Sequence, residues 1–510
     1  MSLKIGGKIE RVNGKELSYE QFVERFFEKN EPVLLTGLMD DWRACKSWVT
    51  EDGKPNLHFV SNHFGSSKVQ VAECGKREST DQKRAQMSVK EFITYWLELS
   101  NRKCSDSVNC SNKNENLLYL KDWHFVKEYP NFVAYCTPPF FVDDWLNLYL
   151  DTHKMHEDPN ACQDINEISC SDYRFVYMGP KGTWTPLHAD VFRSYSWSAN
   201  VCGRKQWHFL SPSQCDLLFD RNMRSSVYDI FEDVSETQFP GFKKAIWLEC
   251  TQEQNEVIFV PSGWYHQVHN MEDTISINHN WFNAYNLSWV WNLLMKDYCE
   301  AKEYIEDIRD ICDNFEGLCQ RNLAANTGMN FFDFFTFITR FAIAHLVLLY
   351  QLLQNERGFS GTGLRQAQQL ITNLKSIYEV SSNMIPLDAF TEKNPYCPLE
   401  ENQYFSIEIR EMLTAPEFIR LCSKFNRIYR ATSVGCEQGI RKSDEGMEDH
   451  LLIQPLESDL LDSEFVNALG CKISDPKRLI ETINSAIKYL NAMAPSCTLF
   501  SFLNESKNVV

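Results

Sequence analysis

The pattern of apolar and polar positions changes along the chain, and its first part mixes helix and strand signals. Ser18 followed by Gln21 forms a capping-box pattern that predicts the start of a helix. Residues 31–37 form a short apolar run that ends at a glycine, which predicts a buried strand. Residues 68–73 alternate between polar and apolar side chains as a strand does, whereas residues 88–99 return to helical spacing. The chain is therefore expected to begin with helices beside strands.

Between residues 117 and 283 the pattern is that of many short strands separated by turns. The runs with strand character are 117–120, 173–178, 196–201, 206–210, 256–260 and 274–280. Turn residues separate them, as at Gly179-Pro180 and Ser211-Pro212. Regular short strands with frequent turns predict an all-β sandwich or barrel rather than a parallel sheet covered by helices.

Helical spacing dominates from residue 289 onward. The helical runs are 289–315, 331–354, 363–380, 403–430 and 475–493. Polar segments near 100–116, 152–172 and 433–450 interrupt the pattern and are expected to be loops, the last of them flexible. We therefore expect a mainly β domain with N-terminal helical elements at 1–288 and a helical C-terminal region at 289–510.

Composition and charge narrow the range of partners. The 510 residues include 51 basic and 69 acidic side chains, a formal charge of -18, and the acidic excess is dispersed along the chain. A protein that grips nucleic acid through its phosphates needs a basic face, so direct nucleic-acid binding is not expected. With 43% apolar and 13% aromatic residues, the chain has ample material for packed cores.

Three features bear on the compartment in which the protein works. Residues 1–15 are polar and lack the apolar run of a secretory signal. The most apolar stretch, Phe341–Leu353, is too short to span a bilayer, so we expect a buried helix and no membrane association. The 18 cysteines form no CxxC pair and no close-set framework, which favours free thiols in a reducing, cytoplasmic or nuclear compartment.

One group of residues can carry chemistry. His188 and Asp190 are two apart, so in an extended chain both side chains point to the same side and can reach one metal ion. His266 follows in the segment 261–266, which we interpret as the end of the strand 256–260. Two imidazoles and one carboxylate form the facial triad of non-haem Fe(II) oxygenases, which leaves positions open for a co-substrate and O₂. The alternative is that His188 caps a turn and His266 is an ordinary core histidine.

A nearby lysine bears on this choice. Lys205, in Gly203-Arg-Lys-Gln-Trp207, opens a strand after Asp190. Its ammonium group could bind the far carboxylate of a dicarboxylic co-substrate whose other end chelates the metal. Without the triad, Lys205 would be an ordinary solvated lysine at a strand end.

Two longer segments resemble a known family. They are GTWTPLHADVFRSYSWSANVCGRKQW at 182–207 and VIFVPSGWYHQVHNMEDTISINHNW at 257–281, and both resemble the JmjC family of 2-oxoglutarate oxygenases. The entry segment, 18–42, is similar to that of the family's hydroxylase branch. The resemblance extends over roughly residues 8–290 and implies the double-stranded β-helix of the cupin fold, with helical flanks.

The resemblance also implies roles for individual residues. His188, Asp190 and His266 resemble the iron ligands, which makes Fe(II), 2-oxoglutarate and O₂ the expected cofactors and co-substrates. The residues that resemble the 2-oxoglutarate pocket are Lys205, Thr185, Tyr119 and Asn280, with Asn278 as a weaker candidate. His269 departs from the apolar residue that is usual after the third ligand, and whether it contributes to the site stays open.

The substrate follows from the resemblance alone. The segment 188–205 is most similar to a branch of the family that hydroxylates a lysyl side-chain carbon of the eukaryotic translation termination (release) factor, in the cytoplasm. The alternatives are a JmjC histone N-methyl-lysine demethylase and a cupin-fold binding protein that has lost catalysis. The helical region 289–510 is expected to buttress the β domain. Dimerisation into a homo-oligomer and substrate docking are its alternative roles.

Overall fold

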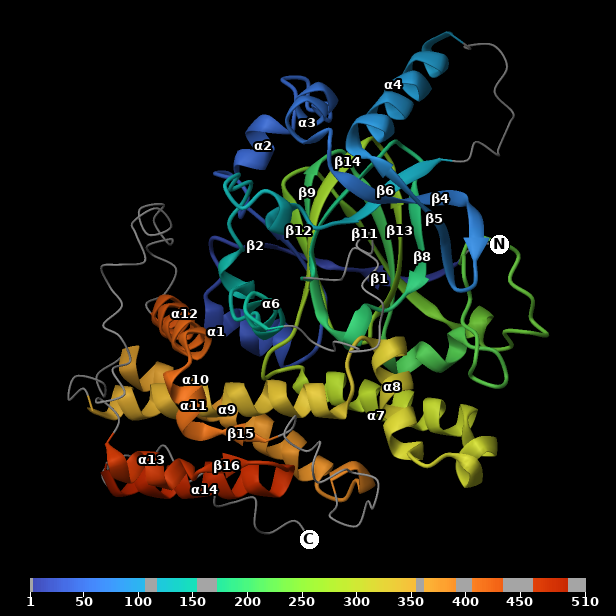
Figure 1. Cartoon of the computed structure of the whole chain (residues 1–510). Coiled ribbons are helices and arrows are strands. Elements are labelled where there is room, and N and C mark those ends of the chain that lie inside the picture. Colours follow the sequence, from blue (N-terminus) through green and yellow to red (C-terminus); the bar gives the residue numbers. More distant parts are fainter. Residues whose placement is uncertain are drawn as a thin grey trace. The chain divides into compact units, whose positions relative to one another are not determined.

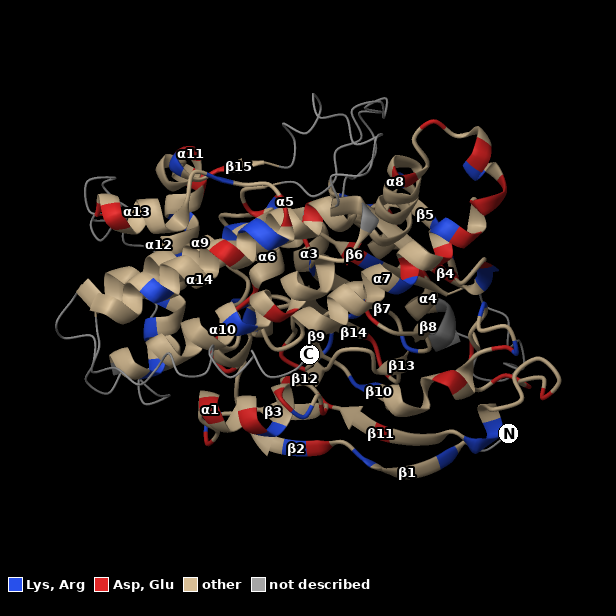
Figure 2. Cartoon of the chain, turned by 90° about the horizontal axis from the view of Figure 1, so that it is seen from below, with Lys and Arg blue, Asp and Glu red and all other residues tan. Residues whose placement is uncertain are grey.

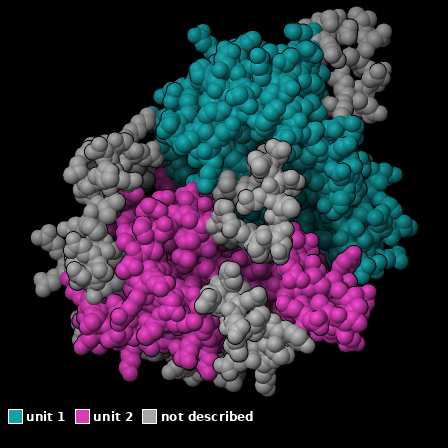
Figure 3. All heavy atoms as spheres, in the orientation of Figure 1, with its two compact units in different colours: residues 1–138, 169–281 teal, residues 139–168, 282–510 magenta. Residues whose placement is uncertain are grey.

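The computed structural model describes residues 3–105, 117–153, 172–354, 362–390, 406–433 and 462–493. Most of the polar segments expected to be loops, at 100–116, 152–172 and 433–450, lies outside the described residues. The chain forms two compact units, which Figure 3 distinguishes by colour. Unit 1 consists of Met1–Pro138 and Ser169–Trp281, and unit 2 of Pro139–Ile168 and Phe282–Val510.

Two β-sheets form the framework of unit 1 (Figure 1). The five-stranded sheet contains, in spatial order, β1 (Lys4–Lys8), β11 (Ile246–Gln252), β10 (Lys205–Leu210), β13 (Tyr265–Asn270) and β8 (Trp184–His188). The nine-stranded sheet contains, in spatial order, β2 (Glu10–Asn13), β3 (Val33–Thr36), β12 (Glu256–Val260), β9 (Tyr195–Cys202), β14 (Thr274–Trp281), β7 (Arg174–Gly179), β6 (Leu118–Trp123), β4 (Lys68–Glu78) and β5 (Asp81–Ser88). The predicted fold class, a mainly β core with helical flanks, is confirmed.

The two sheets of unit 1 share a core. Trp207, Phe209 and Val268 of the five-stranded sheet are buried in one apolar cluster with Ile258 and Val260 of the nine-stranded sheet. These side chains alternate along their strands with residues that face outward, as the pleat requires. The facing sheets therefore enclose an interior, and the functional side chains described below line it.

The helices of unit 1 flank the sheets. They are α1 (Tyr19–Phe22), which continues as a π-helical turn at Val23–Phe27, then α2 (Arg43–Ser47), α3 (Leu57–Phe64), α4 (Val89–Ser105) and α5 (Phe125–Glu128). The predicted capping box is present, since Ser18 caps α1 and the Gln21 side chain accepts from the Ser18 backbone N–H. Phe27 stacks on Tyr195 of β9 with ring centroids 5.1 Å apart, so the aromatic face of this segment covers the outside of the nine-stranded sheet.

Unit 2 is helical. Its elements are α6 (Trp145–Leu150), α7 (Leu287–Tyr304), α8 (Phe315–Thr327), α9 (Phe331–Gln354), α10 (Thr362–Met384), α11 (Ile409–Thr414), α12 (Pro416–Ser433), α13 (Ser463–Leu469) and α14 (Pro476–Met493), with one small sheet of β15 (Ile407–Glu408) and β16 (Lys472–Ile473). The predicted helical character of the C-terminal region is therefore confirmed. By length and composition α9 could cross a membrane, which corrects the expectation of a short apolar stretch, but 78% of its apolar window is buried inside the fold.

One segment belongs to a different unit from the one expected. The sequence placed all of 1–288 in the β domain, whereas the segment 139–168 belongs to unit 2. The reason lies in α6, whose Trp145 stacks on Phe341 of α9 with ring centroids 4.9 Å apart. The Tyr429 hydroxyl of α12 donates to the Asp143 carboxylate over 3.1 Å. An apolar helix needs an apolar partner, and α6 finds it among the helices of unit 2.

Candidate metal centre and adjoining pocket

His188, Asp190 and His266 converge at one point in unit 1. His188 ends β8, Asp190 follows in the loop, and His266 lies directly opposite His188 on the antiparallel neighbour β13. Their potential ligand atoms all lie within 4.8 Å of one another, and the two imidazole centroids are 4.3 Å apart. The sequence placed His266 at the end of the strand 256–260. In the structure it belongs to a separate strand, because residues 261–264 make a turn between β12 and β13.

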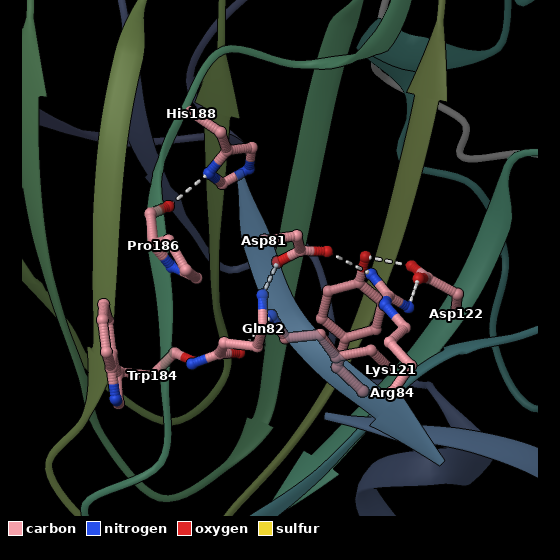
Figure 4. A network of polar contacts seen from close by, with 9 residues as sticks. Asp81, Gln82, Arg84, Lys121, Asp122, Trp184, Pro186 and His188 are labelled. Atoms are coloured by element: carbon pink, nitrogen blue, oxygen red, sulfur yellow. Dashed lines mark hydrogen bonds and ion pairs between the residues drawn. The ribbon is translucent and has the colours of Figure 1, made fainter. Parts of the chain in front are cut away.

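Backbone carbonyls orient both imidazole rings for metal binding. His188 Nδ1 lies 2.8 Å from the Pro186 carbonyl oxygen, and His266 Nδ1 lies 3.1 Å from that of Trp264 (Figure 4 draws the first of these). Nδ1 must carry the proton in both contacts, because a carbonyl only accepts. Within the described residues neither Nε2 atom has a hydrogen-bond partner. Each Nε2 therefore keeps a lone pair for a metal ion, the usual result of such a carbonyl contact.

The charge state of the site also suits a metal. Burial, together with the neighbouring His188, lowers the pKa of His266 to about 4, so the ring is neutral near pH 7. Asp190 Oδ2 accepts a hydrogen bond of 2.7 Å from the Ser196 hydroxyl of β9, which fixes the carboxylate. Two imidazoles with one carboxylate are the donor set of non-haem iron(II) sites, so these residues fit the metal that the sequence implied.

A bulge in β8 brings Thr185 and His188 to the same face. Thr185 lies opposite Val268 and His188 opposite His266, so Pro186 and Leu187 together face the single residue Gln267. Residues three apart would otherwise point to opposite faces of a strand. Thr185 is therefore on the interior side with the candidate metal ligands, as the resemblance implied.

The loop 228–230 supports this bulge. The Leu187 N–H donates to the Tyr228 carbonyl over 2.9 Å. The Gln267 amide accepts from the Ile230 N–H at 3.0 Å and donates to the Asp229 carboxylate at 2.6 Å. The Gln267 side chain is fully buried, its bond to Ile230 is buried and its bond to Asp229 is partly buried. The loop thus satisfies the Leu187 N–H at the bulge and holds the Gln267 side chain opposite it.

Lys205 and Tyr119 form a buried polar pair in the same interior. Lys205, at the start of β10, is only 2% exposed, and its Nζ donates to the Tyr119 hydroxyl over 3.2 Å. Among the described residues, Lys205 has no carboxylate partner. Burial lowers the pKa of its ammonium group to about 7. A buried lysine without a counter-ion is costly, and the missing anion is what a ligand carboxylate would supply.

The two asparagines lie on one face of β14. Asn280 is opposite Ser196, the residue that donates to Asp190, and its amide donates to Ser194 over 3.2 Å. Asn278 is opposite Ser198, and its amide donates to the Ser276 hydroxyl over 3.3 Å. Asn280 is therefore tied to the surroundings of the metal ligand, and Asn278 lies one step along the same face.

His269 lies on the other face of its strand. It is three residues from His266 along the regular part of β13, and its ring stacks on Trp184 with centroids 5.6 Å apart. Burial lowers the pKa of His269 to about 4. The metal-ligand cluster found in the described residues does not include it. His269 packs behind the candidate metal ligands rather than beside them.

The sequence analysis missed a network of charged and polar side chains at the β4–β5 hairpin and β6. The residues are Asp81, Gln82, Arg84, Lys121 and Asp122, which Figure 4 labels, together with Tyr177. Arg84 forms ion pairs with Asp122 and Asp81, and the Tyr177 hydroxyl donates to Asp122 over 2.5 Å. The only hint in the sequence was the spacing of Lys121 two residues after Tyr119, which places both on one face of a strand.

Comparison with known proteins identifies the family. The family model described as "Cupin-like domain" matches residues 19–286, more than half of the chain. The "Arginine-specific demethylase JMJ20" of Arabidopsis thaliana is 53% identical over 95% of this chain and 97% of its own length. The chain belongs to the cupin-like JmjC oxygenase family.

Two further relatives within this family are 2-oxoglutarate and iron-dependent oxygenases by name. The JMJD4 protein of Danio rerio is 41% identical over 64% of this chain and 73% of its own length. The JMJD4 protein of Homo sapiens is 36% identical over 69% of this chain and 79% of its own length. The resemblance seen in the sequence is therefore confirmed at the level of the family.

Proposed function

We propose that this JmjC family member is an Fe(II)- and 2-oxoglutarate-dependent oxygenase that modifies a side chain of a protein substrate. The observation that carries the proposal is the convergence of His188, Asp190 and His266, with both Nε2 lone pairs free, beside the buried and unpaired Lys205. When bound, the iron, 2-oxoglutarate and O₂ supply the oxidation of an unactivated C–H bond.

The residues of the chain bind and orient in this proposal. His188 and His266 hold the metal through Nε2, and Asp190 holds it through the carboxylate that Ser196 fixes. Lys205 binds the far carboxylate of 2-oxoglutarate. Tyr119 and Thr185 contribute hydroxyls to the same carboxylate, and Asn280 and Asn278 line the wall of β14 next to it. The buried interior keeps water away and so strengthens these charged contacts.

We propose a lysyl side chain of the translation release factor as the substrate. The support is the resemblance of residues 188–205 to the branch of the family that hydroxylates it. The relatives named JMJD4 agree with an oxygenase of this branch. An acidic chain with a charge of -18 suits a basic protein substrate. The cysteines in the described part of the chain are all free, which fits the cytoplasmic site of action that we propose.

Removal of a methyl group from arginine is a second candidate. It is favoured by the relative named as an arginine-specific demethylase, which matches almost the whole chain. Hydroxylation of an N-methyl carbon gives a hemiaminal, which breaks down to formaldehyde and the demethylated side-chain nitrogen. The same centre could therefore carry out lysyl hydroxylation or arginine demethylation. Both candidate substrates are cationic side chains. The histone methyl-lysine and non-catalytic alternatives have no comparable support.

One experiment separates these candidates. The purified chain, loaded with Fe(II) and 2-oxoglutarate, is incubated with release factor, with a methyl-arginine peptide and with a methyl-lysine histone peptide. Succinate is measured alongside the mass of each substrate. We expect a gain of one oxygen on the release factor, whereas loss of a methyl group from the arginine peptide would favour the second candidate. His188→Ala is the inactive control, and the proposal fails if wild type and this variant give equal succinate with every substrate.

A further inference from the structure

A second buried lysine lies near the residues that we propose to bind 2-oxoglutarate. Lys121 of β6 is 2% exposed, as buried as Lys205. Burial lowers the pKa of Lys121, as it does that of Lys205. A lysine so far from water is uncommon in a protein unless an anion accompanies it.

Among the described residues, Lys121 forms no direct ion pair, although Asp81 and Asp122 lie close enough for their charges to act on it. Its one hydrogen bond runs from Nζ to the neutral amide oxygen of Gln82, over 3.0 Å. An ammonium group has three donors, so two remain for a ligand. The nearest acids are already engaged, because Asp81 and Asp122 both pair with Arg84, and Asp122 also accepts from Tyr177. Arg84 offsets one of these two carboxylates and Lys121 the other, but among the described residues no carboxylate lies within ion-pair distance of Lys121, so its remaining donors are open to a ligand.

The position of Lys121 places it near two residues that we propose to bind 2-oxoglutarate, Tyr119 and Lys205. Its Nζ lies 5.4 Å from the centroid of the Tyr119 ring, and Lys205 Nζ lies 5.8 Å from the same centroid. The two ammonium groups thus share the ring whose hydroxyl accepts from Lys205. On the other side, Gln82 connects Lys121 to β8, because its amide nitrogen donates to the Trp184 carbonyl over 3.1 Å. Gln82 of β5 thus links the Lys121 ammonium group to β8, the strand of Thr185.

We propose that Lys121 is a second ammonium anchor of the co-substrate pocket, which together with Lys205 makes the pocket selective for dicarboxylic 2-oxo acids over monocarboxylic ones. The inference rests on the proposed function, since it takes the pocket to be the one for 2-oxoglutarate. A lone lysine gives the far carboxylate one charged contact. Two lysines in an interior without water attract the far carboxylate more strongly. Each does so through a charge-assisted hydrogen bond or through its charge at a longer distance, which water screens little there.

The test measures binding rather than turnover. The full chain is loaded with Mn(II) in place of iron, and calorimetry gives the dissociation constants of 2-oxoglutarate and of 2-oxovalerate, which has the same 2-oxo acid end but no far carboxylate. Lys121→Met is compared with wild type. Lys83→Met is the matched control, because Lys83 on the neighbouring β5 is exposed. Lys121→Arg keeps the charge.

We expect Lys121→Met to weaken 2-oxoglutarate binding by about tenfold or more, while 2-oxovalerate binding changes by less than about twofold. Lys121→Arg should bind 2-oxoglutarate nearly as tightly as wild type does. Lys83→Met should leave the dissociation constants of both acids unchanged. Equal losses for the two acids would show that Lys121 only supports the fold, and unchanged binding of both would also overturn the inference. Should Lys121→Met fail to fold, Lys121→Gln, which retains a donor for Gln82, takes its place under the same criteria.

The same experiment distinguishes this inference from the proposed function. If Mn(II)-loaded wild type binds no 2-oxoglutarate, the proposed function fails and the inference fails with it. If wild type binds the dicarboxylate but Lys121→Met binds it equally well, the proposed function stands and only the role of Lys121 is wrong.

Discussion

The imidazoles of the candidate metal centre are oriented by the residues two positions before them. Pro186 and Trp264 each offer a backbone carbonyl to the Nδ1 atom of the following histidine. Main-chain carbonyls cannot be mutated away or change protonation with pH, so they fix the tautomer more firmly than an acidic side chain would. The histidine pair is therefore prepared for a metal ion by local backbone geometry.

Loss of the ammonium group at Lys205 should impair the use of 2-oxoglutarate. We expect Lys205→Ala to raise the 2-oxoglutarate concentration needed for half-maximal turnover by at least about tenfold, because a charged hydrogen bond in a buried site is lost. Excess 2-oxoglutarate should recover part of the rate. Initial rates over a 2-oxoglutarate series check this, with the exposed neighbour Arg204→Ala as control. Unchanged turnover at low 2-oxoglutarate would show that Lys205 is not the anchor.

Individual residues differ in how far the sequence could predict them. The convergence of His188, Asp190 and His266 matches the prediction because two of them are two apart on an extended chain and a side-chain period of two is fixed by the pleat. Lys121 could not be recognised in the same way. Its surroundings come from Gln82 and Arg84 on a hairpin about forty residues earlier, and no local pattern signals that approach.

At the scale of elements, the bulge of β8 depends on a loop that covers it. Gln267 holds that loop through Ile230 and Asp229. We expect Gln267→Leu to lower the free energy of unfolding by roughly 2–4 kcal/mol, since a buried hydrogen bond and a partly buried one to a carboxylate are lost. We also expect about tenfold weaker binding of Mn(II), because His188 lies at the end of the bulge.

Two measurements check the role of the bulge. Urea unfolding followed by circular dichroism gives the stability, and calorimetry gives the metal affinity. Gln206→Leu is the control, since Gln206 on the neighbouring β10 makes a partly exposed hydrogen bond to Thr251. A variant at Gln267 that loses stability but binds Mn(II) as wild type does would separate the loop from the metal centre.

The prediction of elements succeeded where a strand has a clear run or alternation of apolar residues, or where a helix has a clear apolar stripe. Strand β12 was found with its bounds, and helices α9 and α14 within a residue of theirs. Strands β1 and β2 were missed, because they are exposed, rich in glycine and charge, and take their place only by pairing in parallel with β11 and β3. Tertiary pairing of this kind has no local signature.

At the scale of the whole molecule, unit 2 carries a buried acid of its own. Asp143 accepts hydrogen bonds from Trp145 and Tyr429, and burial raises its pKa from 3.8 to about 7. The folded unit therefore retains the proton up to about pH 7, whereas the unfolded chain releases it near pH 4. The stabilisation of the folded state that comes from this protonated carboxyl is fully present below pH 4 and is lost as pH rises towards 7.

This difference gives a prediction for stability against pH. In wild type the free energy of unfolding should decline between pH 5 and pH 8, and Asp143→Asn should make this decline smaller. The variant should also be more stable than wild type at pH 8, by on the order of a few kcal/mol. Urea unfolding at the two pH values checks it, with the exposed Asp310→Asn as control. An equal pH dependence in wild type and Asp143→Asn would mean that this carboxyl does not keep its proton.

The dispersed charge of the whole chain predicts a dependence on salt. Acidic and basic side chains are interspersed over the described residues of both units, with the acids in excess (Figure 2). We expect the association rate with a basic protein substrate to fall by about tenfold between 50 and 300 mM NaCl, since screening weakens long-range attraction. Stopped-flow or surface plasmon resonance measures the rate. A rate that does not change with salt would mean that the acidic surface takes no part in recognition.

The course of the chain between the units has a consequence for the gene. The segment around Trp145 lies between β6 and β7 in the sequence, yet it belongs to unit 2. The coding sequence therefore cannot be divided at one point into an oxygenase cassette and a helical cassette. A chain that ended at residue 288 would keep α6 but lack α9, the helix on which Trp145 packs. Any shortened version of the chain that keeps α6 must therefore also keep the helical region on which it packs.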